Sequence, residues 1–288
     1  MTGIKIDGKV IAQTVKDRVK KAADELKTEG INPCLATVLI GNNTASATYV
    51  KNKHKSCEEV GIATKDHKLN ESVTQQELNN IIDELNADVS VHGILVQLPL
   101  PKHLNEFATT SRISPIKDVD GLTPHNAGLL AMKKAVLVAC TPSGVMEMFD
   151  YHNIDLEGKN IVLINRSNLV GKPLYHLLSE KNATVITCHS KTKNIEQFCQ
   201  SADIIITAVG DRTKFTLTPE MIKKEAIVID VAISRFREHL VGDCDYEKII
   251  EKASFATPVP GGVGPMTVAM LLKNTITAAS LGTQIGRQ

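Results

Sequence analysis

The chain has 288 residues, which is enough for two modest domains or one large one. Hydrophobic residues make up 42% and charged residues 23%, as in an ordinary soluble protein, and the net charge is only +1. The near-zero net charge and the absence of Trp argue against nucleic acid as the main partner. No apolar run approaches the roughly 20 residues needed to span a bilayer, which argues against a membrane.

The six cysteines form no C-x-x-C pair, and several lie in apolar runs such as CLATVLI and VITC. This pattern favours buried free thiols in a reducing compartment over a metal site or a disulfide framework. The N-terminal MTGIKIDGKV has neither the apolar core of a signal peptide nor an Arg-rich transit character. We therefore expect a cytoplasmic protein without a metal.

The first part of the chain alternates between helix and strand signals. Helix-period apolar positions run from residue 7 to Gly30, a good C-terminal stop, and CLATVLIG then predicts a buried strand. The predicted elements are helices over 7–30, 46–61 and 74–86 and strands over 34–41, 63–69 and 92–101. A β-α-β-α-β order implies a parallel sheet covered by helices.

A loop-rich stretch from Pro99 to about Pro142 separates this part from a second alternating part. We place a domain boundary near residue 140 and a helix over CTPSGVMEMFDYHNI. The later predictions are strands over 159–165, 184–188, 203–210 and 225–233, a loop and helix over 166–181, and helices over 194–200 and 266–279.

Tyr49 and Lys53 have the Tyr-x-x-x-Lys spacing of the short-chain dehydrogenases. In that class a glycine-rich nucleotide turn precedes the pair, whereas here the nucleotide-like turn comes later, at 165–173, so we reject that class. On a helix, both residues share a face with Cys57 and Val60. Lys53 either extends its ammonium to the rim of this apolar stripe or is a desolvated lysine with a lowered pKa that exchanges protons.

The turn NRSNLVGKP lies between a buried strand and a helix, where backbone N–H groups and the positive helix end suit a phosphate. It matches neither a Walker loop nor a full G-x-G-x-x-G, so a simple helix-starting turn is the alternative. The next strand ends in CHSKTK, which offers hydroxyl and basic groups but no acid for a ribose. With Arg166 this favours NADP over NAD, unless CHSKTK is only a solvated basic turn.

Two further segments have a structural and a functional interpretation. KDVDG holds too few ligands for a metal; Asp120 either belongs to a turn or accepts hydrogen bonds from an amide- or guanidine-like heterocycle. VPGGVGPMT is either a connector or a ligand-contacting loop, because paired glycines allow close backbone approach.

Seven segments resemble the bifunctional methylenetetrahydrofolate dehydrogenase/methenyltetrahydrofolate cyclohydrolase family, in its order and spacing across nearly the whole chain. They are ATYVKNKHKSCEEVGI, GILVQLPLP, SPIKDVDGL, CTPSG, RSNLVGKP, CHSKT and PVPGGVGPMT. The resemblance implies a two-domain α/β fold: an N-terminal folate and catalytic domain over 1–140, rejoined by 264–288, and a Rossmann-like NADP-binding domain over 141–263. It also implies a homodimer formed through the nucleotide domain.

The activity implied is NADP-dependent oxidation of 5,10-methylenetetrahydrofolate to the methenyl cation, followed by hydrolysis to 10-formyltetrahydrofolate. Lys53 would be the catalytic lysine with Gln97 beside it, Tyr49 would stack on the aminobenzoyl ring, and Asp120 would hold the amino-pyrimidine edge. The other implied folate-site residues are Ser46, Pro260, Gly261 and Gly262. The cofactor site would comprise Thr141, Asn165, Arg166, Ser167, Gly171, Lys172, His189, Ser190 and, near the nicotinamide, Ile233.

Five departures from the family pattern lie in or beside the predicted nucleotide domain. They are Asn165 and Ala232 in place of glycines, Ala139 in place of a proline, and the segments GDRTKFT and GDCDYE. Asn165 matters most, because a glycine there would let the backbone approach the phosphates. One alternative is an inactive folate- or nucleotide-binding protein, which an assay for the methenyl product with NADP⁺ separates from the main prediction. The other is a monofunctional dehydrogenase, against which the presence of Lys53 and Gln97 argues.

Overall fold

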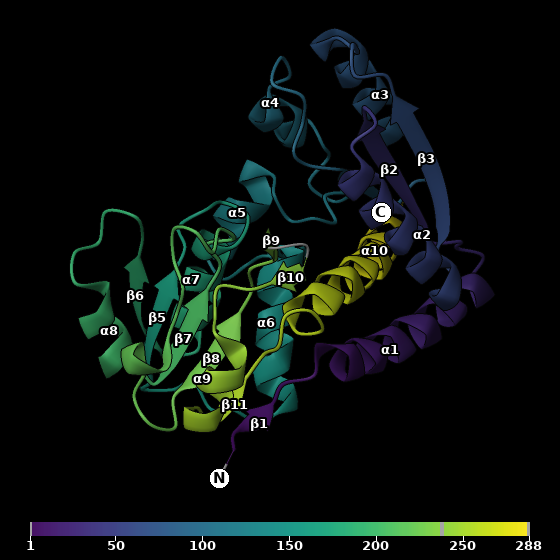
Figure 1. Ribbon diagram of the computed structural model, residues 1–288. Helices are drawn as coiled ribbons and strands as arrows, with labels where there is room; N and C mark the ends of the chain where they lie inside the picture. The colour runs from purple at the N-terminus through teal and green to yellow at the C-terminus, as the bar shows by residue number, and fades with distance from the viewer. Residues whose placement is uncertain (1, 237–238, 287–288) are drawn as a thin grey trace. The chain divides into compact units, whose positions relative to one another are not determined.

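The computed structural model describes residues 2–236 and 239–286, with side chains for all of these except 44–47 and 283–286. The chain forms two compact units (Figure 1). Unit 1 comprises residues 1–13 and 141–267, and unit 2 comprises residues 14–140 and 268–288. Within the described ranges, we find no helix with the length and apolar character that crossing a membrane requires.

Unit 2 is built on a parallel sheet of three strands in the order β3-β2-β4. Its strands are β2 (Cys34–Ile40), β3 (Ala63–Leu69) and β4 (Gly93–Val96), and its helices include most of α1 (Gly8–Thr28), α2 (Thr44–Val60) and α3 (Gln75–Ala87). The predicted helices, strands and parallel sheet of this part are confirmed. Strand β4 ends earlier than predicted, because the prolines of LPLP cannot donate to a ladder.

The alternating side chains of β2 face two different helices. On one face lies an apolar cluster with α3, made of Ala36, Val38, Ile40, Leu78, Ile82, Leu85 and their neighbours. On the other face, Thr37 makes a hydrogen bond to His54 of α2. Because successive side chains of a strand point to opposite faces, α2 and α3 cover opposite sides of the sheet.

The stretch from Pro99 to Pro142 was predicted to be loop-rich, and it contains two short helices that the prediction missed. These are α4 (Glu106–Ser111) and α5 (Pro124–Ala131). Each begins at a side-chain cap: Asn105 accepts from the N–H of Ala108, and Thr123 from that of Asn126. Both helices are too short to show a clear apolar period. Helix α6 (Cys140–Tyr151) follows, as predicted.

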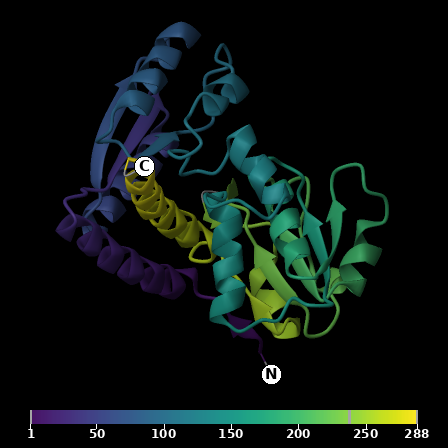
Figure 2. The same ribbon diagram turned by 180° about the vertical axis from the view of Figure 1, so that it is seen from behind.

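Unit 1 is built on a sheet of six parallel strands in the order β1-β11-β8-β7-β5-β6. Figure 2 shows the fold from the opposite side. The strands are β1 (Ile4–Lys5), β5 (Asn160–Ile164), β6 (Thr184–Cys188), β7 (Ile204–Thr207), β8 (Ile227–Asp230) and β11 (Phe255–Ala256). The other elements are α7 (Gly171–Glu180), α8 (Ile195–Ser201), η1 (Pro219–Met221), α9 (Tyr246–Lys252) and the hairpin of β9 (Ser234–Phe236) and β10 (His239–Val241).

The strand order of unit 1 reverses beside β5. The chain passes from β5 to β6 on one side and then returns to β7 on the other. The carboxyl ends of four strands lie in register, with Ile164 paired with both Cys188 and Thr207, and Thr207 paired with Asp230. Open α/β sheets bind ligands beyond the carboxyl ends of their strands at such a reversal.

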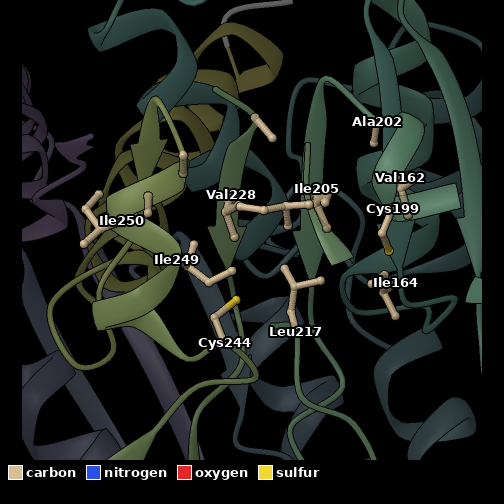
Figure 3. Packing of buried hydrophobic residues seen from close by; sticks show 14 of the residues in the cluster. Val162, Ile164, Cys199, Ala202, Ile205, Leu217, Val228, Cys244, Ile249 and Ile250 are labelled. Atoms are coloured by element: carbon tan, nitrogen blue, oxygen red, sulfur yellow. The ribbon is translucent and has the colours of Figure 1, made fainter. Parts of the chain in front are cut away.

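The core of unit 1 packs against the inner strands of this sheet (Figure 3). Val162, Ile205 and Val228 come from three adjacent strands and pack with Leu217 and Ile249 from the following segments. Five of the six cysteines are buried, and Cys34 is half-buried; all six are free thiols, as their apolar surroundings predicted.

The ends of the chain differ in detail from the predicted domain boundaries. Strand β1 pairs in parallel with β11, so residues 1–13 group with unit 1 and not with 14–140. A two-residue strand gives no periodic signal, so the sequence could not indicate this pairing. Helix α10 (Val263–Gly286) starts before the predicted Met266 and belongs to unit 2 from residue 268.

Candidate active site

In unit 2, Lys53 of α2 lies against Gln97, which follows β4. The Lys53 Nζ donates to the Gln97 Oε1 over 3.0 Å. Gln97 is itself fixed, because its Nε2 donates to the Leu98 carbonyl over 2.7 Å and its backbone N–H donates to Val38 of β2. The sequence-predicted contact between these two side chains is therefore present and rests on the sheet.

The environment of Lys53 favours the desolvated-lysine interpretation. Cys57 and Val60, on the same helix face, are fully buried, while Tyr49 is 48% exposed. Burial lowers the pKa of Lys53 below its usual value, although the nearby carboxylate of Asp120 acts in the opposite direction. A lysine in this state gives up its proton more readily than one at the surface.

The two carboxylates of KDVDG have different environments. Asp118 is buried and accepts from the backbone N–H groups of Leu122 and Thr123 and from the Asn126 amide, so it is this residue that organises the turn. Asp120 is half-buried. Burial raises the pKa of Asp120, Asp118 adds to this, and the Lys53 ammonium opposes it. The structural role in the turn that was considered for Asp120 therefore belongs to Asp118.

Helix α2 is anchored by polar groups that the sequence analysis did not identify. Asp66 of β3 accepts from the Thr37 hydroxyl over 2.7 Å and lies 2.7 Å from the His54 Nε2. On another side of the helix, Lys16 of α1 donates to the Ser56 hydroxyl and the Glu59 carboxylate. Nothing in their spacing connects these residues, because the contacts join separate elements.

The remaining predicted folate residues lie in other parts of the chain. The side chain of Ser46 is outside the described residues. Pro260, Gly261 and Gly262 belong to unit 1, where the Gly261 carbonyl accepts from the Gly8 N–H over 2.9 Å. The loop is therefore attached to the start of α1, and its folate contact stays a prediction.

At the carboxyl edge of the unit 1 sheet, the side chain of Asn165 spans the strand reversal. Its Nδ2 donates to the Ala208 carbonyl after β7 over 2.7 Å. Its Oδ1 accepts from the N–H groups of Ser167 over 2.8 Å and Gly171 over 3.0 Å. A Cβ on Gly171 would overlap the Asn165 backbone, so the turn requires glycine there. The Asn165 side chain thus holds the turn in place by hydrogen bonds within the turn and to the loop after β7.

Basic side chains border the same turn. Arg166 and Lys172 line a pocket of about 250 Å³ with Gly171, Tyr175, His176 and Thr187. The Lys172 Nζ donates to the Asn168 side chain over 2.7 Å, and the Ser167 hydroxyl accepts from the Val170 N–H. This pocket brings Arg166 and Lys172 together, whereas the grouping of Arg166 with the CHSKTK segment stays a prediction.

The other predicted cofactor residues also lie in unit 1. After β6, the His189 Nδ1 accepts from the Lys191 N–H, and the Ser190 side chain is exposed. Ile233, after β8, is 41% exposed, and the Thr141 and Thr267 hydroxyls are 2.8 Å apart. Among the residues described, no cluster of histidine, cysteine or acidic side chains is suited to hold a metal ion.

A buried pair of carboxylates supports this edge and was not predicted. Asp243 accepts from the Thr207 hydroxyl over 2.6 Å and from the N–H groups of Val209 and Gly210, and so fixes the loop after β7. Asp230 accepts from the Cys244 N–H; burial and the charge of Asp243 raise the pKa of Asp230 to about 6. The unusual GDCDYE segment, which contains Asp243, was the only signal.

Unit 1 is a doubly wound parallel sheet with a basic turn at its carboxyl edge. Unit 2 holds a desolvated lysine beside an amide and a carboxylate. Together these features are typical of a nucleotide-dependent α/β enzyme. Residues 6–120 match the catalytic domain of tetrahydrofolate dehydrogenase/cyclohydrolase, and residues 139–283 match its NAD(P)-binding domain. The chain belongs to the tetrahydrofolate dehydrogenase/cyclohydrolase family, as the sequence resemblance predicted.

Individual relatives agree over the full length. The chain is 82% identical over 287 residues to the bifunctional protein FolD of Nitrosopumilus maritimus, covering 100% of both chains. The bifunctional FolD enzyme of Campylobacter jejuni has 46% identity and a TM-score of 0.93, covering 96% of this chain and 98% of that one. The Trypanosoma brucei enzyme, solved with NADP and an inhibitor, has 34% identity and a TM-score of 0.93, covering 99% of each chain.

Proposed function

We propose that this chain oxidises 5,10-methylenetetrahydrofolate with NADP⁺ and then hydrolyses the methenyl product to 10-formyltetrahydrofolate. The observation that carries the proposal is the contact of Lys53 with Gln97 near Asp120, in a chain that matches both domains of the family. The same matches, to a bifunctional relative along the whole chain, favour two activities over one.

The carboxyl edge of the unit 1 sheet fits a phosphorylated dinucleotide. Arg166 and Lys172 supply positive charge in one pocket, and the turn CHSKTK after β6 has a hydroxyl but no carboxylate that would repel a 2′-phosphate. When bound, NADP⁺ supplies the hydride acceptor, and the protein's part is to align substrate and cofactor. The NADP-bound trypanosomal relative supports this choice of cofactor.

Lys53 handles the proton of the hydrolytic step. A water molecule must add to the methenyl carbon and lose a proton as the C–O bond forms. Because burial lowers the pKa of Lys53, a larger share of it is neutral and able to accept that proton. The second water proton ends on the folate nitrogen when its C–N bond breaks. Gln97 accepts from Lys53 and holds the Nζ in place.

Asp120 and Tyr49 position the folate. The Asp120 carboxylate accepts hydrogen bonds from the amino-pyrimidine edge of the pterin, where a charged acceptor makes them stronger than neutral ones. The half-exposed ring of Tyr49 offers a surface on which the aminobenzoyl ring stacks. The family resemblance also assigns folate binding to Ser46, Pro260, Gly261 and Gly262, and cofactor binding to Thr141, Asn165, Ser167, Gly171, His189, Ser190 and Ile233.

The protein acts as a cytoplasmic homodimer. The buried free thiols suit a reducing compartment. The family resemblance favours a dimer formed through the nucleotide unit. Light scattering of the purified chain at micromolar concentration tests the dimer, and a monomer there would contradict it.

The assay follows the absorbance of the methenyl product with NADP⁺ and then its decay by hydrolysis. Lys53→Met should lower the hydrolytic rate by about 10²–10⁴-fold, the usual contribution of a positioned proton-transfer group. Lys55→Met, which changes an exposed lysine of the same helix, is the matched control and should act like the parent. If Lys53→Met keeps hydrolysis within a few-fold of the parent, the assignment is wrong.

A further inference from the structure

Asn274, a buried residue of α10, joins two segments that are distant in sequence. Its Nδ2 donates to the Val119 carbonyl and to the Val138 carbonyl, each over 2.8 Å. The same nitrogen lies 3.7 Å from the Cys140 Sγ. All four residues belong to unit 2, so both hydrogens of one amide fix the segment before Asp120 to the segment before α6.

Two more contacts tighten this junction. The Cys140 thiol donates to the Val119 carbonyl over 3.3 Å. Gly121 has a φ of +67°, and a Cβ there would overlap the backbone of Val138 and Ala139. The backbone on both sides of Asp120 is therefore held against residues 138–140.

The sheet holds the same segment from its other end. Ile94 of β4 donates its backbone N–H to the Lys117 carbonyl over 2.8 Å. The Lys117 ammonium, also buried, donates to the carbonyls of Leu85, Asn86 and Asp88 at the end of α3. With these contacts in place, the Asn274 amide, together with the Cys140 thiol, fixes the direction of the backbone after Val119.

A buried amide that donates to two carbonyls at once is costly to lose, because the Val138 carbonyl loses this donor and the Val119 carbonyl keeps only the weaker Cys140 thiol. The segment can recover hydrogen bonds only by shifting toward other donors. Asp120 immediately follows Val119, so such a shift moves its carboxylate relative to Lys53 and Gln97. Small displacements of a binding group cost much of its contribution.

We propose that Asn274 is a positioning residue of the folate site, which places the Asp120 carboxylate through the Val119 and Val138 carbonyls. This inference rests on the proposed function, in which Asp120 binds the pterin. It gives α10 a role in substrate binding that its apolar sequence does not reveal.

The test replaces Asn274 with leucine, which has a similar size and no donor. The matched control is Thr275→Val, because the buried Thr275 hydroxyl donates to the Leu271 carbonyl within the same helix. Asn274→Leu should raise the KM for both folate substrates at least tenfold and leave the KM for NADP⁺ within twofold. Thr275→Val should change neither. If the two variants change the folate KM equally, the inference is overturned.

A double-mutant cycle with Asp120→Asn tests whether the effect passes through Asp120. In that background, adding Asn274→Leu should change the folate KM less than twofold. The reason is that Asp120→Asn has already removed the carboxylate that Asn274 positions. Fully multiplicative effects would overturn the inference while leaving the proposed function intact. If Asp120→Asn alone leaves the folate KM unchanged, the proposed folate site itself fails. Should Asn274→Leu not fold, Asn274→Ser, which keeps one donor, is measured in the same way and should raise the folate KM by a smaller factor.

Discussion

Replacing Asn165 with glycine, the residue that the family commonly has at this position, should weaken the binding of NADP⁺. The side chain makes three hydrogen bonds, to Ser167, Gly171 and Ala208, that hold the turn after β5 in one conformation. Glycine removes all three and also gives the backbone more freedom. The turn must then be ordered when the cofactor binds, and the ordering free energy is subtracted from the binding free energy.

The expected size follows from these contacts. Each bond contributes about 1 kcal/mol net, and the half-buried position of Asn165 reduces the total to about half, or roughly 1.5 kcal/mol. This corresponds to about a tenfold increase in the KM for NADP⁺. An opposing effect exists, because the freed N–H groups of Ser167 and Gly171 could bind a phosphate oxygen. We expect the loss of order to dominate, because three bonds are lost and at most two donors are gained.

The assay is steady-state dehydrogenase kinetics with NADP⁺, with hydrolysis of added methenyltetrahydrofolate as the control in the same protein. Asn165→Gly should raise the KM for NADP⁺ and leave the hydrolysis unchanged. Asn165→Asp keeps both acceptor bonds but cannot donate to Ala208, and so separates the two halves of the amide. If Asn165→Gly binds NADP⁺ as tightly as the parent or more tightly, the reasoning from a pre-ordered turn is refuted.

Three further outcomes follow from other buried groups. The hydrolytic rate should rise with pH as Lys53 loses its proton, with a midpoint below the ordinary 10.5 in a pH–rate profile; a midpoint at or above that value would contradict its desolvation. Asp230 has a folded pKa of about 6, above its unfolded value, so the folded state binds the extra proton and the free energy of unfolding should increase by about 2 kcal/mol as pH falls from 7 to 4. In urea unfolding, Asp230→Asn should lack this part of the pH dependence. If the free energy of unfolding of Asp230→Asn changes with pH as in the parent, the raised pKa of Asp230 is contradicted. Lys117→Met leaves three carbonyls at the end of α3 without their cation and should cost about 2–3 kcal/mol in urea unfolding, whereas exposed Lys102→Met should cost little.

The sequence predicted those elements whose pattern repeats along the chain. Helices α1 and α3 and strand β2 carry their own period of apolar residues, and their boundaries lie within a few residues of the prediction. The short helices α4 and α5 and the strand β1 were missed, because six, eight and two residues are too few for a period. Helices α4 and α5 are stabilised by the caps that directly precede them, Asn105 and Thr123, whereas β1 is stabilised by β11, a strand distant in the sequence.

The same limit applies to the candidate site. The spacing of Tyr49 and Lys53 placed both on one helix face, but only the fold shows that burial lowers the pKa of the lysine. The choice between Asp118 and Asp120 as the turn residue depends on which oxygen meets the N–H groups of Leu122 and Thr123. Asn274 gave no signal at all, because its partners are carbonyls of apolar residues far away in the chain.

The return of α10 to unit 2 also bears on the order in which the protein can be completed during synthesis. Asn274 is made 155 residues after Val119, the residue whose carbonyl it holds. Domains generally fold as units while the chain emerges from the ribosome. The six-stranded sheet of unit 1 can form once β11 has emerged, whereas the backbone around Asp120 must wait for almost the whole chain. A nascent chain of this protein can therefore assemble the six-stranded sheet before the backbone around Asp120 is fixed in place.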